Sequence, residues 1–211
     1  MPIDVPKDTW PGEVRSVTLG ASADQGGSRV RAVTVGGEKT LPFMHFEAEM
    51  PNTPVIAVEI KDRRPDDWSP LLLEAWGEAV DDPAAWAKAA QETGCDLIQL
   101  SFSPTDSSGE TTTAESAVST VKAVLEASGL PLLVFGPGQA ELDNELLVAV
   151  AEATKGERLV LGICEDKNYR TIVATAMAND HLVVARSPMD VNLAKQLNIL
   201  ISDMDFPSNG S

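Results

Sequence analysis

Short apolar runs alternate along the chain with segments of helical spacing from residue 54 onward. The runs are rich in Val, Ile and Leu and lie at 55–60, 96–102, 131–135, 159–164 and 182–187. Apolar runs without polar alternation are typical of strands covered on both faces, and hence of a parallel sheet. Three of the intervening segments end near Gly or Asn-Asp, which suits a helix C-terminus. The pattern predicts an α/β fold of five βα units with right-handed crossovers.

The first fifty residues follow a different pattern. The stretches "EVRSVTLGA" and "RVRAVTVGGEK" alternate apolar and polar residues with a period of two, and "SADQGGS" lies between them. This alternation predicts a β-hairpin with one solvated face, followed by a turn at Gly36-Gly37. We therefore expect an N-terminal β-hairpin extension over residues 1–50 and a βα region over residues 51–211, within one structural domain.

Five βα units are compatible with two architectures. One is a complete open sheet of the flavodoxin type, and the other is the first five-eighths of a (β/α)8 TIM barrel, which typically needs about 250 residues. No Gly-rich phosphate loop follows the first strand, and the hairpin resembles the plug that many barrels carry at the bottom. Both features favour a partial TIM barrel over residues 51–211.

Local signals refine this prediction at three places. The low-complexity stretch at 101–116 predicts a loop after the second strand. Asp190 stands at the N-cap of a final helix with a broad apolar stripe. Trp68, Trp76 and Trp86 are spaced as packing residues of the outer helical ring rather than as a ligand-stacking surface.

Composition and charge exclude several classes of function. The 211 residues include 32 acidic and 16 basic side chains, which gives a formal net charge of −16. Such a balance disfavours binding to nucleic acid and to anionic membranes. No apolar run approaches the roughly 18 residues of a transmembrane helix, and the first residues lack the features of a secretory signal. Cys95 and Cys164 are far apart, as expected for reduced, buried thiols of a cytoplasmic protein.

Few residues offer catalytic chemistry. His181 precedes the fifth strand, which predicts a surface or helix-end position away from the carboxyl ends of the strands. His45 lies between Phe43 and Phe46 and is expected in an aromatic patch. Without a His or Cys cluster we expect no zinc or iron–sulfur site on this chain. This sparse set of residues favours chemistry that resides on a cofactor or a partner.

Three longer stretches carry a family resemblance. They are "GGEKTLPFMHFEAEMPN", "DDPAAWAKAAQETGCDLIQL" and "ARSPMDVNLAKQLNILI". In their order and spacing the chain resembles, from about Trp10 to about Ile201, the small (delta) subunit of the corrinoid iron–sulfur protein of the acetyl-CoA synthase/carbon monoxide dehydrogenase system. The resemblance implies a (β/α)8 barrel that pairs with a large subunit carrying a four-iron cluster and the corrinoid (cobamide). It also implies a non-catalytic scaffold and cap, while the complex takes a methyl group from a methyltransferase to acetyl-CoA synthase.

The same resemblance implies candidate cofactor-binding residues. A corrin ring needs apolar cover on its face, and its amide rim needs donors and acceptors. The candidates are Ser187, Met189, Asp190 and Asn192, followed by Ser101 and Phe135. Turn and cap chemistry explains the same residues equally well.

The ending of the chain departs from the family. Family members are expected to continue through three more βα units, whereas this chain turns into "DMDFPSNGS" after the final helix. We therefore expect a C-terminally truncated subunit. Two alternatives stay open: a stand-alone barrel of the pterin-dependent methyltransferase type, with Asp190 and Asn192 holding the pterin, and a truncated fragment without function.

Overall fold

Five parallel strands form the central sheet of the computed structural model, which describes residues 5–104 and 111–206. Four of the five strands lie within the predicted apolar runs, and the first strand extends one residue beyond its run. They follow one another in the sheet in sequence order: β3 (Ala57–Lys61), β4 (Leu97–Ser101), β5 (Leu132–Phe135), β6 (Val160–Cys164) and β7 (Leu182–Ala185). The α/β fold and the parallel sheet are thus confirmed.

Helices connect the strands, and all five predicted helices are present. Their bounds are α2 (Pro83–Glu92), α3 (Ala114–Ala127), α4 (Ala140–Ala153), α5 (Tyr169–Asn179) and α6 (Val191–Ser202). A short helix α1 (Pro70–Trp76) and a 3-10 turn η3 (Gly77–Asp81) precede α2 and were not predicted. Seven residues are too few to establish a helical period, so the run "PLLLEAW" gave no usable signal.

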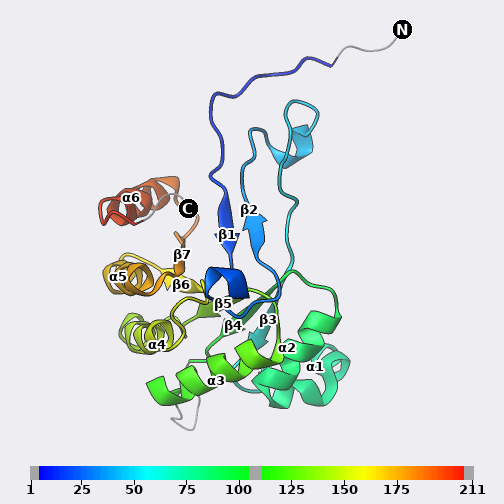
Figure 1. Ribbon diagram of the computed structural model, residues 1–211, viewed down its shortest axis with the longest axis vertical. Coiled ribbons are helices and arrows are strands. Elements are labelled where there is room, and N and C mark those ends of the chain that lie inside the picture. The colour runs from blue at the N-terminus through cyan, green and yellow to red at the C-terminus, as the bar shows by residue number, and fades with distance from the viewer. Residues whose placement is uncertain (1–4, 105–110, 207–211) are drawn as a thin grey trace.

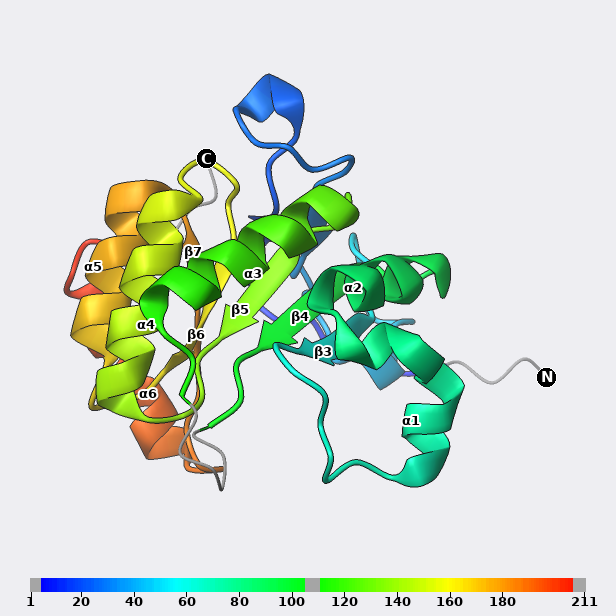
Figure 2. The same cartoon turned by 90° about the horizontal axis from the view of Figure 1, so that it is seen from below.

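All of the long helices cover the same face of the sheet (Figures 1 and 2). A single apolar cluster contains Ile60, Leu100 and Leu161 of the strands together with buried residues of every helix from α2 to α6. Consecutive parallel strands joined by right-handed crossovers must place their helices on one side. The flavodoxin-type alternative, with strand order 2-1-3-4-5 and helices on both faces, is wrong for this sheet.

Three tryptophans fill the outer layer near β3 and β4. Trp86 of α2 is fully buried, and the rings of Trp68 and Trp76 meet it edge-on with centroids 5.4 and 6.0 Å away. Edge-to-face packing of this kind stabilises aromatic clusters beyond the area they bury. The predicted packing role of these residues is confirmed.

The opposite, inner face of the sheet is covered at its amino end by the predicted hairpin. Strands β1 (Val17–Leu19) and β2 (Val33–Val35) pair antiparallel, and a 3-10 turn η1 (Ala23–Gln25) lies between them. Leu19 packs with Leu97 and Val160, the first residues of β4 and β6. The hairpin therefore closes the inner face at the end where the strands begin.

Arg29 fastens the hairpin to the sheet. Its side chain is buried, with 1% exposed. Each guanidinium nitrogen donates at least one hydrogen bond, and the five donor–acceptor distances are 2.6–3.2 Å. The acceptors are the carboxylate of Glu157, the hydroxyl of Ser28 and the backbone carbonyls of Leu125, Ser128 and Leu130. This number matches the five N–H donors of an arginine. One side chain thus ties together the hairpin, the end of α3 and the loop before β6.

His181 lies between the end of α5 and the start of β7, near the predicted helix end, but it is buried rather than at the surface. Its Nδ1 accepts a hydrogen bond from Leu159 N at 3.1 Å, and its Nε2 lies 3.0 Å from Ala151 O. Because Nδ1 accepts, Nε2 carries the proton and donates to the carbonyl, so the ring is neutral. Burial lowers the pKa of His181, against the opposing effects of Ala151, Asp180 and Glu157.

The predicted loop at 101–116 is shorter than expected, because Ser101 ends β4 and α3 begins at Ala114. Residues 105–110 of that stretch lie outside the described part of the chain. Across the described ranges, no helix combines the length and the apolar character that spanning a bilayer requires.

Replacing Arg29 tests the fastening of the hairpin. The change Arg29→Lys leaves carbonyl oxygens without donors, and we expect the free energy of unfolding to fall by about 3 kcal/mol in urea titrations. Arg31→Lys is the matched control, since the half-exposed Arg31 side chain pairs with Asp96, and it should cost less than about 1 kcal/mol. Equal losses in the two variants would contradict the assigned role.

His181 predicts a pH dependence of stability. The folded pKa lies below the unfolded value, so the unfolded state binds more protons as the pH falls below about 6.5. We expect stability from this group to be complete above that pH and to be lost as the pH falls through the folded pKa. Urea titrations between pH 8 and 5 should show the loss in the wild type and a smaller slope in His181→Gln. The only other histidine, the exposed His45, supplies the control, and His45→Gln should keep the wild-type slope.

Candidate functional site

The carboxyl ends of the strands lie side by side at the end of the sheet opposite the hairpin. Strand register places Lys61, Ser101, Phe135 and Gly162 side by side across β3, β4, β5 and β6. Two of the predicted site residues, Ser101 and Phe135, are therefore direct neighbours. Ser101 is buried and Phe135 is half-buried.

A polar cluster surrounds Ser101 on the inner face. Lys61 Nζ donates to Glu59 Oε1 at 2.8 Å, and Gln99 Nε2 donates to Ser101 Oγ at 3.0 Å. Burial alone would raise the pKa of Glu59, but hydrogen bonds from Lys61, Ser101 and Gln99 outweigh it and lower that pKa. Glu59 and Lys61 thus form an ion pair on β3, beside Ser101 of β4.

Glu59, Lys61 and Gln99 were not among the predicted site residues. The signal was present, because in "VEIK" and "LIQLS" every second residue is polar within an otherwise apolar strand. Alternating residues share a face of a strand, so this pattern marks a polar inner face at the carboxyl end.

The other predicted site residues lie in the turn between β7 and α6. Met189 is fully exposed at positive φ, and its N–H donates to Ser187 O at 2.8 Å. Asp190 Oδ1 accepts hydrogen bonds from the backbone N–H groups of Asn192 and Leu193, at 2.8 and 3.3 Å. The predicted N-cap role of Asp190 is confirmed. Both hydrogen bonds of the cap go to the same carboxylate oxygen, Oδ1.

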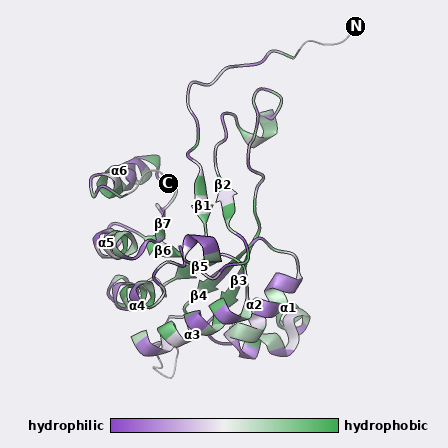
Figure 3. Cartoon of the chain, viewed as in Figure 1, coloured by the Kyte–Doolittle hydropathy of each residue, from purple (hydrophilic) through white to green (hydrophobic). Residues whose placement is uncertain are grey.

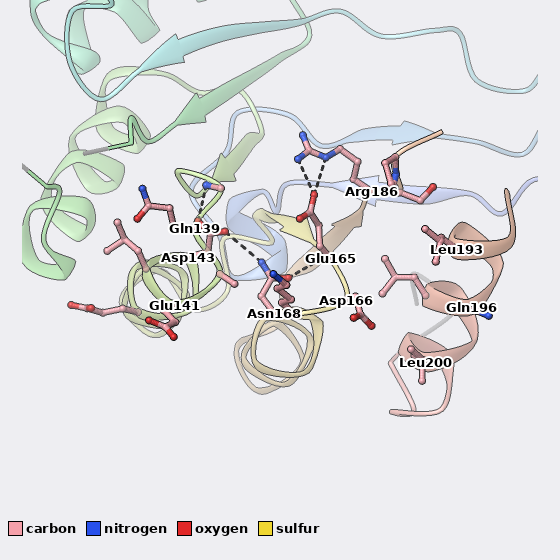
Figure 4. A pocket seen from close by; sticks show the side chains of 18 of the residues that line it. Gln139, Glu141, Asp143, Glu165, Asp166, Asn168, Arg186, Leu193, Gln196 and Leu200 are labelled. Carbon is pink, nitrogen blue, oxygen red and sulfur yellow. Dashed lines mark hydrogen bonds and ion pairs between the residues drawn. The ribbon is translucent and has the colours of Figure 1, made fainter. Parts of the chain in front are cut away.

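A cavity of about 1410 Å³ opens beside this turn (Figure 4). The loops after β5, β6 and β7 and the inner side of α6 form its walls, which combine carboxylates, amides and leucines. The lining includes Gln139, Glu141, Asp143, Glu165, Asp166, Asn168, Arg186, Ser187, Leu193, Gln196 and Leu200. Of the predicted site residues, Ser187 lines this cavity.

Hydrogen bonds fix the walls of the cavity to one another. Asn168 donates to Ile163 O at 3.0 Å and accepts from Glu165 N at 2.7 Å. Asp143 is buried, and burial raises its pKa although the Gly138 and Gln139 backbone opposes the shift. Glu165 pairs with Arg186 at 2.8 Å, which connects the β6 loop to the end of β7. The cavity is therefore largely preformed.

The structure groups the predicted residues in two places. Ser101 and Phe135 lie on the inner face of β4 and β5, whereas Ser187, Met189, Asp190 and Asn192 lie beyond β7, with β6 between the two groups. Both groups are at the carboxyl end of the sheet, as predicted.

Histidines and cysteines are placed away from this end or are buried. His181 lies at the amino end of β7, and the ring of the exposed His45 contacts Phe46 edge-on at 6.1 Å. Both cysteines are free and buried as predicted, and burial raises the pKa of the Cys164 thiol to about 12. In the part of the chain that the structure describes, no group of three or more His, Cys, Asp or Glu side chains could hold a metal ion. The arrangement is that of a binding surface with preformed polar and apolar parts.

Comparisons with known proteins identify a family. A family model described as the CO dehydrogenase/acetyl-CoA synthase delta subunit matches residues 16–208. The chain is 36% identical over 208 residues to the acetyl-CoA decarbonylase/synthase complex subunit delta of Archaeoglobus fulgidus. The aligned region covers 95% of this chain and 45% of that protein. It is 35% identical over 191 residues to subunit delta 1 of Methanosarcina thermophila, covering 90% of this chain and 43% of that protein. The chain thus spans about half the length of the curated relatives it matches.

Substitutions at Asp190 separate its cap role from a ligand role. Asp190→Ala removes the acceptor of two backbone N–H groups and should lower the free energy of unfolding by about 1 kcal/mol. Asp190→Ser retains a capping oxygen and should recover most of that loss. Urea titrations of both variants measure the effect, and an Asp190→Ala variant as stable as the wild type would contradict the cap.

Proposed function

The chain belongs to the CO dehydrogenase/acetyl-CoA synthase delta subunit family, and on this basis we propose that it serves in a corrinoid iron–sulfur methyl carrier. Its role is that of the small subunit, which scaffolds and caps a cobamide held by the large subunit. The assembly accepts a methyl group from a methyl-tetrahydropterin or methyl-tetrahydrofolate methyltransferase and delivers it to acetyl-CoA synthase. The observation that carries the proposal is the family match over residues 16–208.

We propose a TIM-type barrel as the complete form of the fold. Consecutive strand order, helices on one face and a hairpin at the amino end of the inner face are features of such barrels. In this arrangement further βα units pair with the outer edges of β3 and β7. The carboxyl end of the sheet then becomes the top of the barrel, where ligands bind.

The residues at the carboxyl end fit a corrinoid as a cover. Met189 offers an exposed apolar side chain, while Asn192 and Ser187 offer an amide and a hydroxyl. The cavity beside Ser187 exceeds the roughly 300–1,000 Å³ typical of pockets for small molecules, which suits part of a large macrocycle. When bound, the corrinoid supplies the methyl-carrying chemistry. The side chains of this chain cover its face and exchange hydrogen bonds with its amide rim.

The proposed partners follow from the same assignment. The stable partner is the large subunit with the corrinoid and the iron–sulfur cluster, and the methyltransferase and acetyl-CoA synthase bind transiently. Two free, buried thiols are compatible with a reducing compartment, so we place the complex in the cytoplasm.

Co-expression with the corrinoid-carrying large subunit tests the function. We expect one species in size exclusion that absorbs at both protein and corrinoid wavelengths. Met189→Asp should keep the complex but lower the corrinoid retained per complex at least about threefold, because a charge replaces apolar cover. Val30→Asp, at an exposed apolar position of the hairpin loop, is the matched control and should retain the wild-type amount. Separate elution of the wild-type chain would overturn the proposed function.

A further inference from the structure

An arm continues the two strands of the hairpin away from the sheet (Figure 1). We define the arm as residues 5–15 and 38–50, which include the 3-10 turn η2 (Pro42–Met44). Its two segments are held together by backbone bonds at Val14 and by Glu47. The Glu47 carboxylate accepts hydrogen bonds from Asp8 N at 3.2 Å and from Trp10 Nε1 at 3.3 Å. Val14 N donates to Glu38 O at 2.8 Å.

The arm exposes large apolar side chains. Trp10, Leu41, Phe43 and Phe46 are 51%, 50%, 70% and 41% exposed, and we call these four residues the arm patch. Figure 3 shows the hydrophobic colour of η2 at the far end of the arm. Trp10 is tied to Glu47, the neighbour of Phe46, so the patch spans both segments. Clustered exposed aromatic residues are typical of interaction surfaces.

The arm stands on the side of the sheet that the helices leave uncovered. The helices form an arc around the outer face, and the hairpin and the arm lie on the other side (Figures 1 and 2). On this side the hairpin covers the amino end only. Among the described strands, β3 and β7 each have one paired neighbour, so each has one free edge. Parallel strands are found almost only with both faces covered. Units that join both free edges into a closed barrel would lie on this side of the sheet.

We propose that the arm patch is the docking surface for the βα units that pair with the free edges of β3 and β7. This inference rests on the barrel described under the proposed function, and it adds a specific contact. Ile56, the residue before β3, is a further exposed apolar side chain at the amino end of that strand. The arm also carries five carboxylates against three basic side chains. Its occupant therefore presents an apolar pocket with lysine or arginine at the margin.

The arm is preorganised for this contact. The two hydrogen bonds to Glu47, the backbone bond at Val14 and an ion pair between Lys39 and Glu13 at 3.1 Å hold it without the occupant. A surface that is already ordered loses little conformational entropy when it binds. The aromatic side chains can then act as anchors in a partner pocket.

The test uses a polypeptide that could supply the closing units. The chain is co-expressed with the part of the Archaeoglobus fulgidus subunit delta that lies outside the 208 matched residues, and the complex is isolated through a tag on that part. We expect the two polypeptides to purify together. Trp10 fluorescence should move to shorter wavelength in the complex, and this shift should be absent in Trp10→Phe.

Two apolar-to-charged variants distinguish the arm from other surfaces. Phe43→Asp should raise the Kd at least about 30-fold, the effect of losing an interface anchor. Leu71→Asp, on the exposed side of α1, is the matched control and should change the Kd less than about threefold. Circular dichroism confirms that both variants fold.

Three results would overturn the inference. The first is that the wild-type chain and the segment of the Archaeoglobus fulgidus subunit do not purify together. The second is that Phe43→Asp and Leu71→Asp bind alike, which leaves the proposed function intact if the large subunit still co-elutes. The third is that the chain forms a dimer in ultracentrifugation that Phe43→Asp dissociates, because a second copy would then be the occupant.

Discussion

Right-handed crossovers between consecutive parallel strands constrain this molecule more than any single contact. Each crossover returns the chain to the next position in the sheet and deposits its helix on the same side. The outer face thus obtains one continuous apolar core, with Trp86 and Leu146 among its fully buried members. The inner face receives no helix, so every covering group on that side must come from elsewhere in the chain or from another polypeptide.

The two ends of the inner face differ in how they are covered. At the amino end the hairpin supplies apolar cover, and its buried Arg29 has hydrogen-bond partners. At the carboxyl end the strands finish in Lys61, Ser101 and Phe135, and the adjoining loops expose charged and apolar side chains together. Stability is concentrated at one end and binding capacity at the other, a division that parallel βα folds share.

Sequence patterns predicted the parts of the fold that depend on local repetition. Runs of Val, Ile and Leu located the five strands, and a single capping residue, Asp190, located the start of α6. Patterns did not predict the contacts that join distant segments. Arg29 looks like any polar residue of a loop until the fold brings Leu125 and Glu157 to it. His181 was placed correctly in the chain, but its burial depends on Ala151 and Leu159, which the sequence does not relate to it. Strand order settled which site candidates are neighbours, and it follows from three-dimensional pairing rather than from spacing.

The fastening of the hairpin also affects how the chain reaches its fold during synthesis. Arg29 and its carboxylate partner Glu157 are 128 residues apart, so the ribosome makes the hairpin long before its anchor. At about 5–20 residues per second, the interval is roughly 6–26 s. Over that time β1 and β2 have neither their ion pair nor the first residues of β6 to pack on, and an isolated two-stranded hairpin is marginally stable in water. The hairpin leaves the ribosome before the sheet but is among the last segments to become ordered, and a nascent chain that has not yet reached β6 exposes the apolar side of its hairpin to chaperones and proteases.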